Sequence, residues 1–306
     1  MTIPIMSNGW PAPATDSRAR EKLFITCRLI ADTMAIHKTE GIILSSANWS
    51  ESSQTLTIFT PDCGKLTLTV KGSRQLNGKR GRPLHFARLE FTCYLRGEKG
   101  SGYLSDVEPV DVFLFEKDGQ LGRLAFASAA IELLNNLLTG GEPQPACYQI
   151  TLSFLRMIDT IEKKRLPGLF AGYILRLASL LGFRPNLAGC ASCGKAVENM
   201  IPDSEQSGEK LMLSIERGGL VCADCRSTLI GENSLIGLDV EFHNKLIRLM
   251  QSSLAEASNI SISLKELQEL VDIMTMLLKY HAESMKQLKS FDFLDKLTAA
   301  VKNFGG

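Results

Sequence analysis

Four cysteines in the second half of the chain have the spacing of a metal site. Cys190 and Cys193 form one Cys-x-x-Cys pair, and Cys222 and Cys225 form another after 28 intervening residues. Each pair can place two thiolates on one ion, and four thiolates complete the tetrahedral shell of Zn²⁺, with zinc–sulfur distances of about 2.3 Å. Because unrelated buried thiols would not produce two identical spacings, the sequence predicts one zinc ion bound by these four residues.

A four-cysteine site favours a structural metal over a catalytic one, because four protein ligands leave no open position for water or substrate. An iron–sulfur cluster would also accept four cysteines. Redox chemistry by one pair alone is a weaker alternative, since no thioredoxin-like βαβ pattern surrounds either pair. The four histidines are scattered along the chain, and we predict none of them to be catalytic.

A second candidate site is a basic stretch between Cys63 and Leu89 that contains no acidic residue. Such a stretch creates a positive field that attracts phosphates, and the glycines within it suit a loop that follows a nucleic-acid backbone. The alternative is a solvated basic loop without a ligand. We predict seven nucleic-acid-binding residues: Lys65, Lys71, Arg74, Lys79, Arg80, Arg82 and Arg88.

Few aromatic side chains near this stretch could stack on bases. They are Trp49, Phe59, His85, Phe86, Tyr94 and Tyr103. Most of them suit a core as well as a surface, so we assign a stacking role only to Trp49, whose polar neighbours indicate exposure.

Enzyme motifs are missing from the sequence. The segment from Gly72 to Arg80 fails as a P-loop, because five residues separate its glycines and arginine follows the lysine. Neither Gly-x-Ser-x-Gly nor His-Glu-x-x-His occurs, and the acidic residues Asp106, Glu108 and Asp111 are interpreted as solvated. We predict that the protein is not an enzyme; a metal-dependent nuclease and a zinc-ribbon adaptor that binds only proteins are the alternatives.

The composition is that of a folded protein of two or three domains. The chain has 306 residues, of which 44% are hydrophobic and 22% charged, with a net charge of +1. Eight cysteines are too few for a disulfide scaffold, which favours reduced thiols. Neither a secretory signal nor an apolar run of about 18 residues is present, so we expect a cytoplasmic protein that does not enter a membrane.

Five short runs between residues 41 and 107 have the alternation of β-strands. They span residues 41–46, 55–60, 65–71, 88–96 and 102–107. Pro61 to Gly64 has the turn residues of a hairpin between the second and third runs, and the alternation turns Cys93 inward. Five short strands suit a closed barrel of the oligonucleotide-binding (OB) type, which leaves no exposed sheet edge.

After residue 111 the apolar period becomes helical. We predict helices over 121–138, 147–164, 167–181, 239–257 and 263–285, with a short hairpin at 211–215 and 219–221 between the cysteine pairs. The fold class is therefore α+β: an N-terminal OB-type β-barrel (34–112) followed by an α-helical domain (113–186 and 233–306). A zinc-ribbon-like insertion (187–232) interrupts the helices, and residues 1–33 form a tail.

Many short motifs in order resemble the RecO recombination-mediator family. They include Lys38 to Leu44, Leu56 to Thr60, Lys71 to Arg74, Leu180 to Pro185 and Tyr280-His281, together with the cysteine pairs. The resemblance covers about residues 36–295. It implies a non-catalytic DNA repair protein in which the family's basic loop corresponds to Lys71, Arg74, Lys79, Arg80 and Arg82.

The resemblance also implies partners. Members of the family bind single- and double-stranded DNA, anneal complementary strands and act with RecR to load RecA onto DNA coated by single-stranded DNA-binding protein. They recognise the acidic, apolar C-terminal tail of that coating protein. Some relatives lack the zinc cysteines, which supports a structural metal. We expect this chain in the cytoplasm, associated with the nucleoid.

Overall fold

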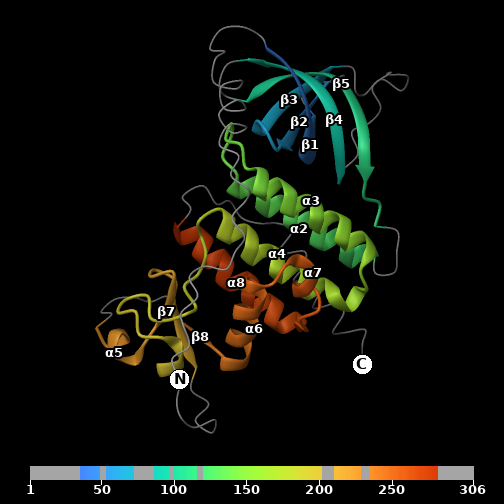
Figure 1. The fold of residues 1–306 in the computed structure, drawn as a ribbon. Coiled ribbons are helices and arrows are strands. Elements are labelled where there is room, and N and C mark those ends of the chain that lie inside the picture. The colour runs from blue at the N-terminus through green and yellow to red at the C-terminus, as the bar shows by residue number, and fades with distance from the viewer. Residues whose placement is uncertain are drawn as a thin grey trace, which may run out of the picture.

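The computed structural model describes residues 35–48, 53–71, 86–96, 100–115, 120–201, 210–228 and 235–281. Within these ranges a β-barrel lies at one end of the molecule, helices form its middle, and a small sheet lies at the other end (Figure 1). The predicted α+β class is confirmed. None of the described helices is both long and apolar enough to cross a membrane.

The barrel consists of β1 (Ala35–Asn48), β2 (Ser53–Thr60), β3 (Gly64–Lys71), β4 (Ala87–Arg96) and β5 (Ser101–Val112). The strands close in the order β1-β2-β3-β5-β4, and only β3 and β5 pair in parallel. The predicted OB-type barrel is therefore confirmed. β1 begins earlier than predicted because its first half pairs with β4 while its second half pairs with β2.

Alternating side chains fill the barrel. Leu66, Leu68 and Cys93 are buried in its interior cluster, as the alternation predicts. The predicted hairpin between β2 and β3 is also present. Its turn is closed by the Thr60 hydroxyl, which accepts from the Cys63 N–H at 3.0 Å and donates to the Gly64 carbonyl at 2.9 Å. Gly64 has a φ of 67°, which glycine adopts without steric cost.

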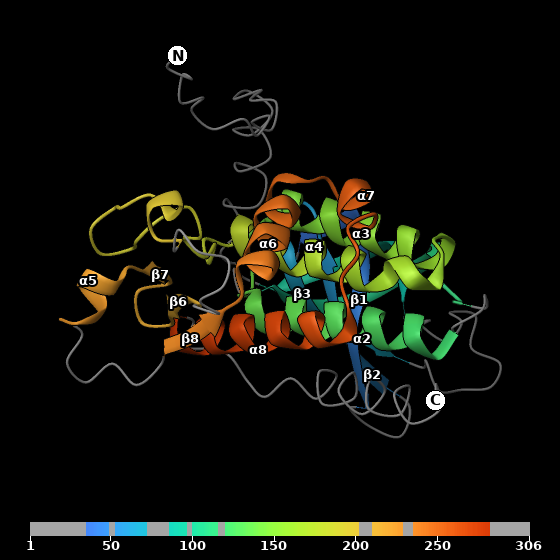
Figure 2. The same ribbon diagram turned by 90° about the horizontal axis from the view of Figure 1, so that it is seen from below.

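The helical part contains α2 (Gln120–Leu137), α3 (Pro145–Thr160), α4 (Leu166–Leu180), α6 (Val240–Gln251), α7 (Leu254–Ala257) and α8 (Leu264–His281). Shorter turns are η1 (Lys163–Arg165), η2 (Val197–Asn199) and α5 (Ala223–Arg226). α4 is central: it contacts α2 and α3 on the barrel side and α6, α7 and α8 on the other (Figures 1 and 2).

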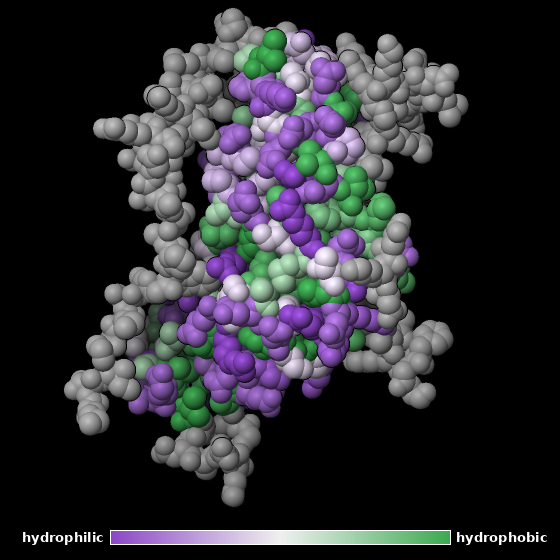
Figure 3. Space-filling view, turned by 45° about the vertical axis from the view of Figure 1, so that its right-hand side comes forward, coloured by the Kyte–Doolittle hydropathy of each residue, from purple (hydrophilic) through white to green (hydrophobic). Residues whose placement is uncertain are grey.

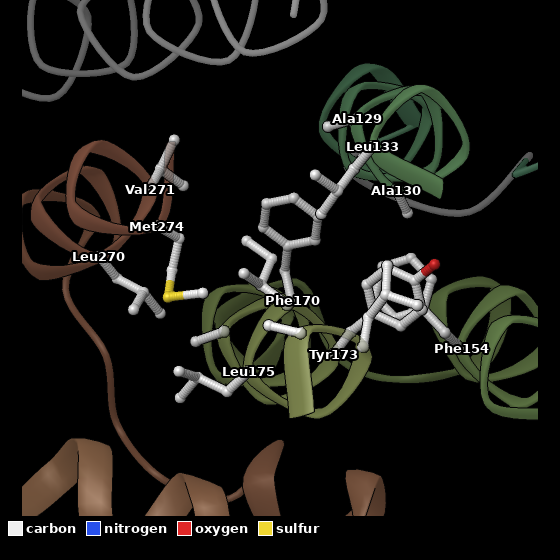
Figure 4. Packing of buried hydrophobic residues seen from close by; sticks show 14 of the residues in the cluster. Ala129, Ala130, Leu133, Phe154, Phe170, Tyr173, Leu175, Leu270, Val271 and Met274 are labelled. Carbon is white, nitrogen blue, oxygen red and sulfur yellow. The ribbon is translucent and has the colours of Figure 1, made fainter. Parts of the chain in front are cut away.

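α4 is buried because nearly all its side chains are apolar. Phe170 points between Leu133 of α2 and Met274 of α8 in the close view of the core (Figure 4). On the other side of α4, the Tyr173 ring stacks on Phe154 of α3, with 4.3 Å between ring centroids. Burial of such large side chains is the main stabilising contribution to this part of the fold.

The barrel and the helices share this core. Ile42 of β1 and Phe59 of β2 are cross-strand partners, and both are fully buried among the helices rather than inside the barrel. The Phe59 ring lies edge-on to Tyr148 of α3, with 5.8 Å between centroids. The barrel is therefore packed directly onto α3.

Some large apolar side chains stay exposed where β5 leads toward α2. They are Val110, Val112, Leu114, Leu121 and Leu124. In the space-filling view, hydrophobic residues gather at the level where the barrel meets the helices (Figure 3). Exposed apolar groups of this kind are typical of contact surfaces.

The prediction of one helix over residues 239–257 is wrong. α6 ends at Gln251, and Ser252 has an extended ψ of 150°. Ser253 then starts α7 with a capping box, because its hydroxyl accepts from the Glu256 N–H while the Glu256 carboxylate accepts from the Ser253 N–H. The Ser-x-x-Glu spacing was available in the sequence as a signal for a new helix start.

The small sheet consists of β6 (Leu211–Ser214), β7 (Gly219–Val221) and β8 (Leu235–Leu238) in the order β7-β6-β8. The predicted hairpin corresponds to β6 and β7, while β8 was not predicted. β6 pairs with both neighbours in antiparallel fashion, and the sheet lies at the end of the molecule opposite the barrel (Figure 1).

Candidate metal centre and nucleic-acid interface

The four predicted metal ligands come together. The sulfurs of Cys190, Cys193, Cys222 and Cys225 all lie within 4.8 Å of one another, and no other such group of ligating side chains occurs in the described ranges. Sγ of Cys193 is 3.7 Å from Sγ of Cys222. Four sulfurs around a tetrahedral zinc ion would lie about 3.8 Å apart. The cluster therefore fits a metal ion such as zinc.

Two backbone turns present these sulfurs. In the first, the Gly194 N–H donates to the Cys190 carbonyl at 2.9 Å, and Gly194 has a φ of 75° that suits glycine. In the second, Cys222 leaves β7 and enters α5 as its N-cap residue. A hydrogen bond of 2.7 Å from the Ala191 N–H to the Leu220 carbonyl ties the two turns together. The ligand positions are thus fixed by main-chain contacts.

The cysteine environment favours a cation. Burial alone would raise the pKa of Cys190, but hydrogen bonds from the backbone of Cys222, Cys193 and Ser192 lower that pKa to about 6. Contact with the sulfurs of Cys193 and Cys222 raises the pKa of Cys225 to about 12. The site therefore stabilises the thiolate of Cys190 and disfavours that of Cys225. A bound divalent cation would let all four ionise.

Two histidines attach the cysteine-bearing segment to the helices. Nε2 of His243 on α6 is 2.8 Å from the carbonyl oxygen of Leu187, and Nε2 of His281 on α8 is 2.9 Å from that of Ile215. A carbonyl oxygen only accepts, so Nε2 carries the proton in each ring. Histidine spacing in the sequence gave no signal for these contacts.

The predicted nucleic-acid-binding residues fall into two groups. Arg74, Lys79, Arg80 and Arg82 lie outside the described residues, so their role stays a prediction. Lys71 is the last residue of β3, from which this segment continues. Nζ of Lys65 donates to the Asn135 carbonyl of α2 at 2.8 Å. Lys65 thus has a structural contact between barrel and helices that was not predicted.

The structure does not support the prediction for Arg88, because carboxylates already bind its guanidinium. Nη1 lies 2.5 Å from Glu40 and Nε lies 2.9 Å from Asp111, and the side chain is only 17% exposed. We therefore remove Arg88 from the phosphate-binding set. Its carboxylate partners are distant in sequence and become neighbours only through the register of β4 with β1 and β5.

The interpretation of Asp111 as solvated is also wrong. Its carboxylate accepts from Arg156 of α3 at 2.8 Å as well as from Arg88. The hydrogen bond from Arg156 contributes most to lowering the pKa of Asp111, and Arg88 adds to it. Burial would lower the pKa of Arg88, but its bonds to Asp111 and Glu40 raise it. Asp111 is thus an ionised link between the barrel and α3.

Both halves of the chain match one protein family. Residues 34–113 match the family described as Recombination protein O N terminal, and residues 119–290 match Recombination protein O C terminal. The first match contains the barrel, and the second contains the helices and the cysteine cluster. The family resemblance thus extends over both structural parts.

Curated relatives carry the name DNA repair protein RecO. The one from Caldanaerobacter subterraneus subsp. tengcongensis is 31% identical over 273 residues, which cover 87% of this chain and 100% of the relative. That from Symbiobacterium thermophilum is 27% identical over 271 residues, with 87% and 100% coverage. That from Pelotomaculum thermopropionicum is 27% identical over 273 residues, with 89% and 98% coverage.

Proposed function

Because this chain belongs to the Recombination protein O (RecO) family and has a role in DNA repair, we propose that it acts by binding DNA and not as an enzyme. In this proposal it binds single- and double-stranded DNA and anneals complementary strands. The observation that carries the proposal is the OB-type barrel, in which β3 leads directly into the basic segment that begins at Lys71.

Annealing requires no covalent chemistry in this proposal. Cations of the segment that contains Arg74, Lys79, Arg80 and Arg82 neutralise phosphates and release counterions. Two strands held on one positive surface repel each other less, so complementary bases meet more often. The four-cysteine cluster would hold one zinc ion as a structural brace of the small sheet.

The partners follow from the family resemblance. We propose that the protein acts with RecR to load RecA onto DNA coated by single-stranded DNA-binding protein, and that it recognises the C-terminal tail of that coating protein. We also propose a cytoplasmic protein associated with the nucleoid. An annealing assay with and without the coating protein tests DNA contact and partner recognition together.

The salt dependence of binding tests the role of the basic segment. If about five phosphates are neutralised, log affinity for single-stranded DNA falls with log salt at a slope near −3.5, from roughly −0.7 per contact. Replacing Arg74, Lys79, Arg80 and Arg82 together by alanine removes four contacts, so we expect a slope nearer to −1. Fluorescence anisotropy at several salt concentrations measures both slopes.

A control variant has the same change in net charge. It replaces Lys163, Lys164, Lys265 and Lys279, four exposed lysines of the helical part, by alanine. We expect this variant to keep the slope of the unaltered protein. An unchanged slope in the basic-segment variant would contradict the assignment. Cleavage of DNA by the protein with Mg²⁺, Mn²⁺ or Zn²⁺ would instead indicate a nuclease.

A further inference from the structure

Three barrel strands place two tyrosines side by side on the outer surface. Tyr94 of β4 is the register partner of Tyr103 of β5, and Ile36 of β1 is the register partner of Tyr94. The strand neighbours Cys93 and Leu104 are buried inside the barrel. Because strand side chains alternate between faces, Tyr94 and Tyr103 point outward. Both are half-buried, and Ile36 is 65% exposed.

An arginine extends this row. Arg96 of β4 is exposed, and its guanidinium carbon lies 5.1 Å from the centroid of the Tyr103 ring. A guanidinium over an aromatic face is held by a cation–π attraction, and its plane is itself a surface on which nucleobases stack. Two rings and one guanidinium, presented by neighbouring strands, thus form one continuous aromatic and cationic surface on a preorganised backbone, which lowers the entropy cost of binding.

Charge changes along this face of the barrel. The exposed Lys38 follows Ile36 two residues further along β1, on the same side of the strand. Lys38 shares its row with the exposed Asp106, and the row after it consists of three carboxylates, because Glu40, Glu90 and Glu108 are register partners. Arg88 binds Glu40, so Glu90 and Glu108 are the carboxylates of that row that repel phosphates, whereas Arg96 beside the tyrosines attracts them. The tyrosine end of this face is therefore more favourable for a nucleic-acid strand than the glutamate end.

The parallel pairing of β3 and β5 brings this end close to the predicted basic segment. Thr69 of β3 is the register partner of Tyr103. Lys71, the last residue of β3, follows Thr69 by two positions. The predicted basic segment, which begins at Lys71, therefore starts close to the tyrosine row.

We propose that Tyr94, Tyr103 and Arg96 form a stacking platform for unpaired nucleobases. The proposal rests on the proposed DNA binding and adds a preference for single strands, because duplex bases are stacked on one another. The sequence pointed to Trp49, which lies outside the described residues. Phe59 and Phe86, in contrast, pack in the helical core.

The experiment compares two oligonucleotides of equal length and charge. One is an oligothymidylate of about 16 nucleotides, and the other carries abasic sites throughout. Stacking contributes about 1 to 3 kcal/mol per base, so we expect the full chain to bind the oligothymidylate at least about tenfold more tightly. Replacing Tyr94 and Tyr103 by alanine should remove most of this preference, leave abasic affinity unchanged, and preserve the salt slope.

Tyr280 on α8 supplies the control, since it is a 58% exposed tyrosine outside the barrel. Tyr280→Ala should keep the preference for bases, and Tyr94→Phe with Tyr103→Phe should keep it as well. If the unaltered protein binds neither oligonucleotide, the proposed DNA binding itself fails. If it prefers bases and the double alanine variant retains that preference in full, the platform is overturned while DNA binding stands.

A second measurement uses the unaltered protein and does not depend on how the variants fold. Oligonucleotides with 5-iododeoxyuridine are crosslinked to the protein by ultraviolet light, and the modified peptides are identified by mass spectrometry. Adducts on Tyr94 or Tyr103 are the expected result. Adducts confined to other peptides, such as the one that contains Trp49, would overturn the proposal.

Discussion

Asp111 accepts hydrogen bonds from two arginines that belong to different parts of the fold. Arg88 comes from β4 of the barrel and Arg156 from α3. The Asp111 side chain is 30% exposed, so solvent weakens these ion pairs without removing them. At the scale of single residues this carboxylate is the clearest polar link between barrel and helices.

We predict that Asp111→Asn lowers the free energy of unfolding by about 1 to 2 kcal/mol at pH 7, because hydrogen bonds to charged groups contribute about this much. The folded-state pKa of Asp111 lies below its ordinary value. Its stabilisation is therefore complete above the unfolded pKa of about 3.9 and is lost as the pH falls through the lower folded pKa. Urea unfolding at several pH values measures the difference.

Glu108→Gln is the matched control, since Glu108 is an exposed carboxylate on the same strand. We expect it to change stability by less than about 0.5 kcal/mol. The difference in unfolding free energy between Asp111→Asn and the unaltered protein should stay constant from pH 7 to about 5 and become smaller below about pH 4. A difference that grows as the pH falls would contradict the assignment of Asp111 as an ionised carboxylate.

The role of a single residue could be predicted from the sequence where the chemistry of its site fixes the spacing to the next residue of that site. Cys190 and Cys193 could be assigned because two thiolates on one ion need nearly this separation. Arg88 could not, because Glu40 lies 48 positions away and meets it only through strand register. A basic residue in a sequence therefore shows its charge but not whether a carboxylate already binds it.

At the scale of elements, two glycines let α4 approach α7 closely. A Cβ atom at Gly168 would lie 2.5 Å from the Ile260 carbonyl oxygen and 2.7 Å from that of Ala257. At Gly172 it would lie 2.5 Å from the Ala257 Cβ. Backbone atoms cannot move aside as a flexible side chain can, so these helices require glycine at the crossing.

We predict that Gly168→Ala destabilises the protein by about 1 to 3 kcal/mol, the usual cost of overpacking. Gly122→Ala on α2 is the matched control, because a Cβ there has no neighbour within 4 Å. Alanine is the better helix former, so this control should be neutral or stabilising by up to about 1 kcal/mol. Thermal unfolding measures both variants, and equal effects would refute the close crossing.

Helices and strands could be predicted from the sequence where the apolar pattern repeats over many residues. The apolar periodicity found α2, α3, α4 and α8, and alternation found all five barrel strands. β8 has only four residues, which are too few to show a repeating pattern in the sequence. It is a strand because it pairs with β6. The break between α6 and α7 was missed because apolar periodicity continues across it while the Ser253 cap interrupts the backbone. The predicted domain boundaries stay a prediction.

At the scale of the whole molecule, the cysteine cluster and the barrel lie at opposite ends (Figure 1). β6 and β7 nevertheless join the helical core through Leu211, Leu213 and Leu220. A metal ion at the cluster would therefore stabilise the helical part at a distance from the barrel.

We predict one zinc ion per chain and its loss in Cys190→Ser. Structural zinc contributes about 10 to 16 kcal/mol in small domains. If the loss of zinc lowers the free energy of unfolding of this protein by only about 3 kcal/mol, the unfolding midpoint falls by roughly 10 °C. The affinity for DNA and its salt slope should stay unchanged. Metal analysis, thermal unfolding and anisotropy measure the three quantities.

Ser192→Ala is the control for this prediction, because Ser192 is exposed between the first two cysteines and contributes no sulfur. It should keep the zinc ion and the unfolding midpoint. Protein purified without chelator that contains no zinc would refute the metal assignment. A visible absorption band would indicate an iron–sulfur cluster instead.

The burial of Ile42 and Phe59 among the helices has a mechanical consequence. A DNA strand pulled taut during repair would transmit its tension to any protein that holds it. Through Phe59 and Tyr148, such a load on the barrel passes straight into α3 and is shared by the helices around α4. If the barrel binds DNA as proposed, it would therefore resist that force together with the larger helical part behind it.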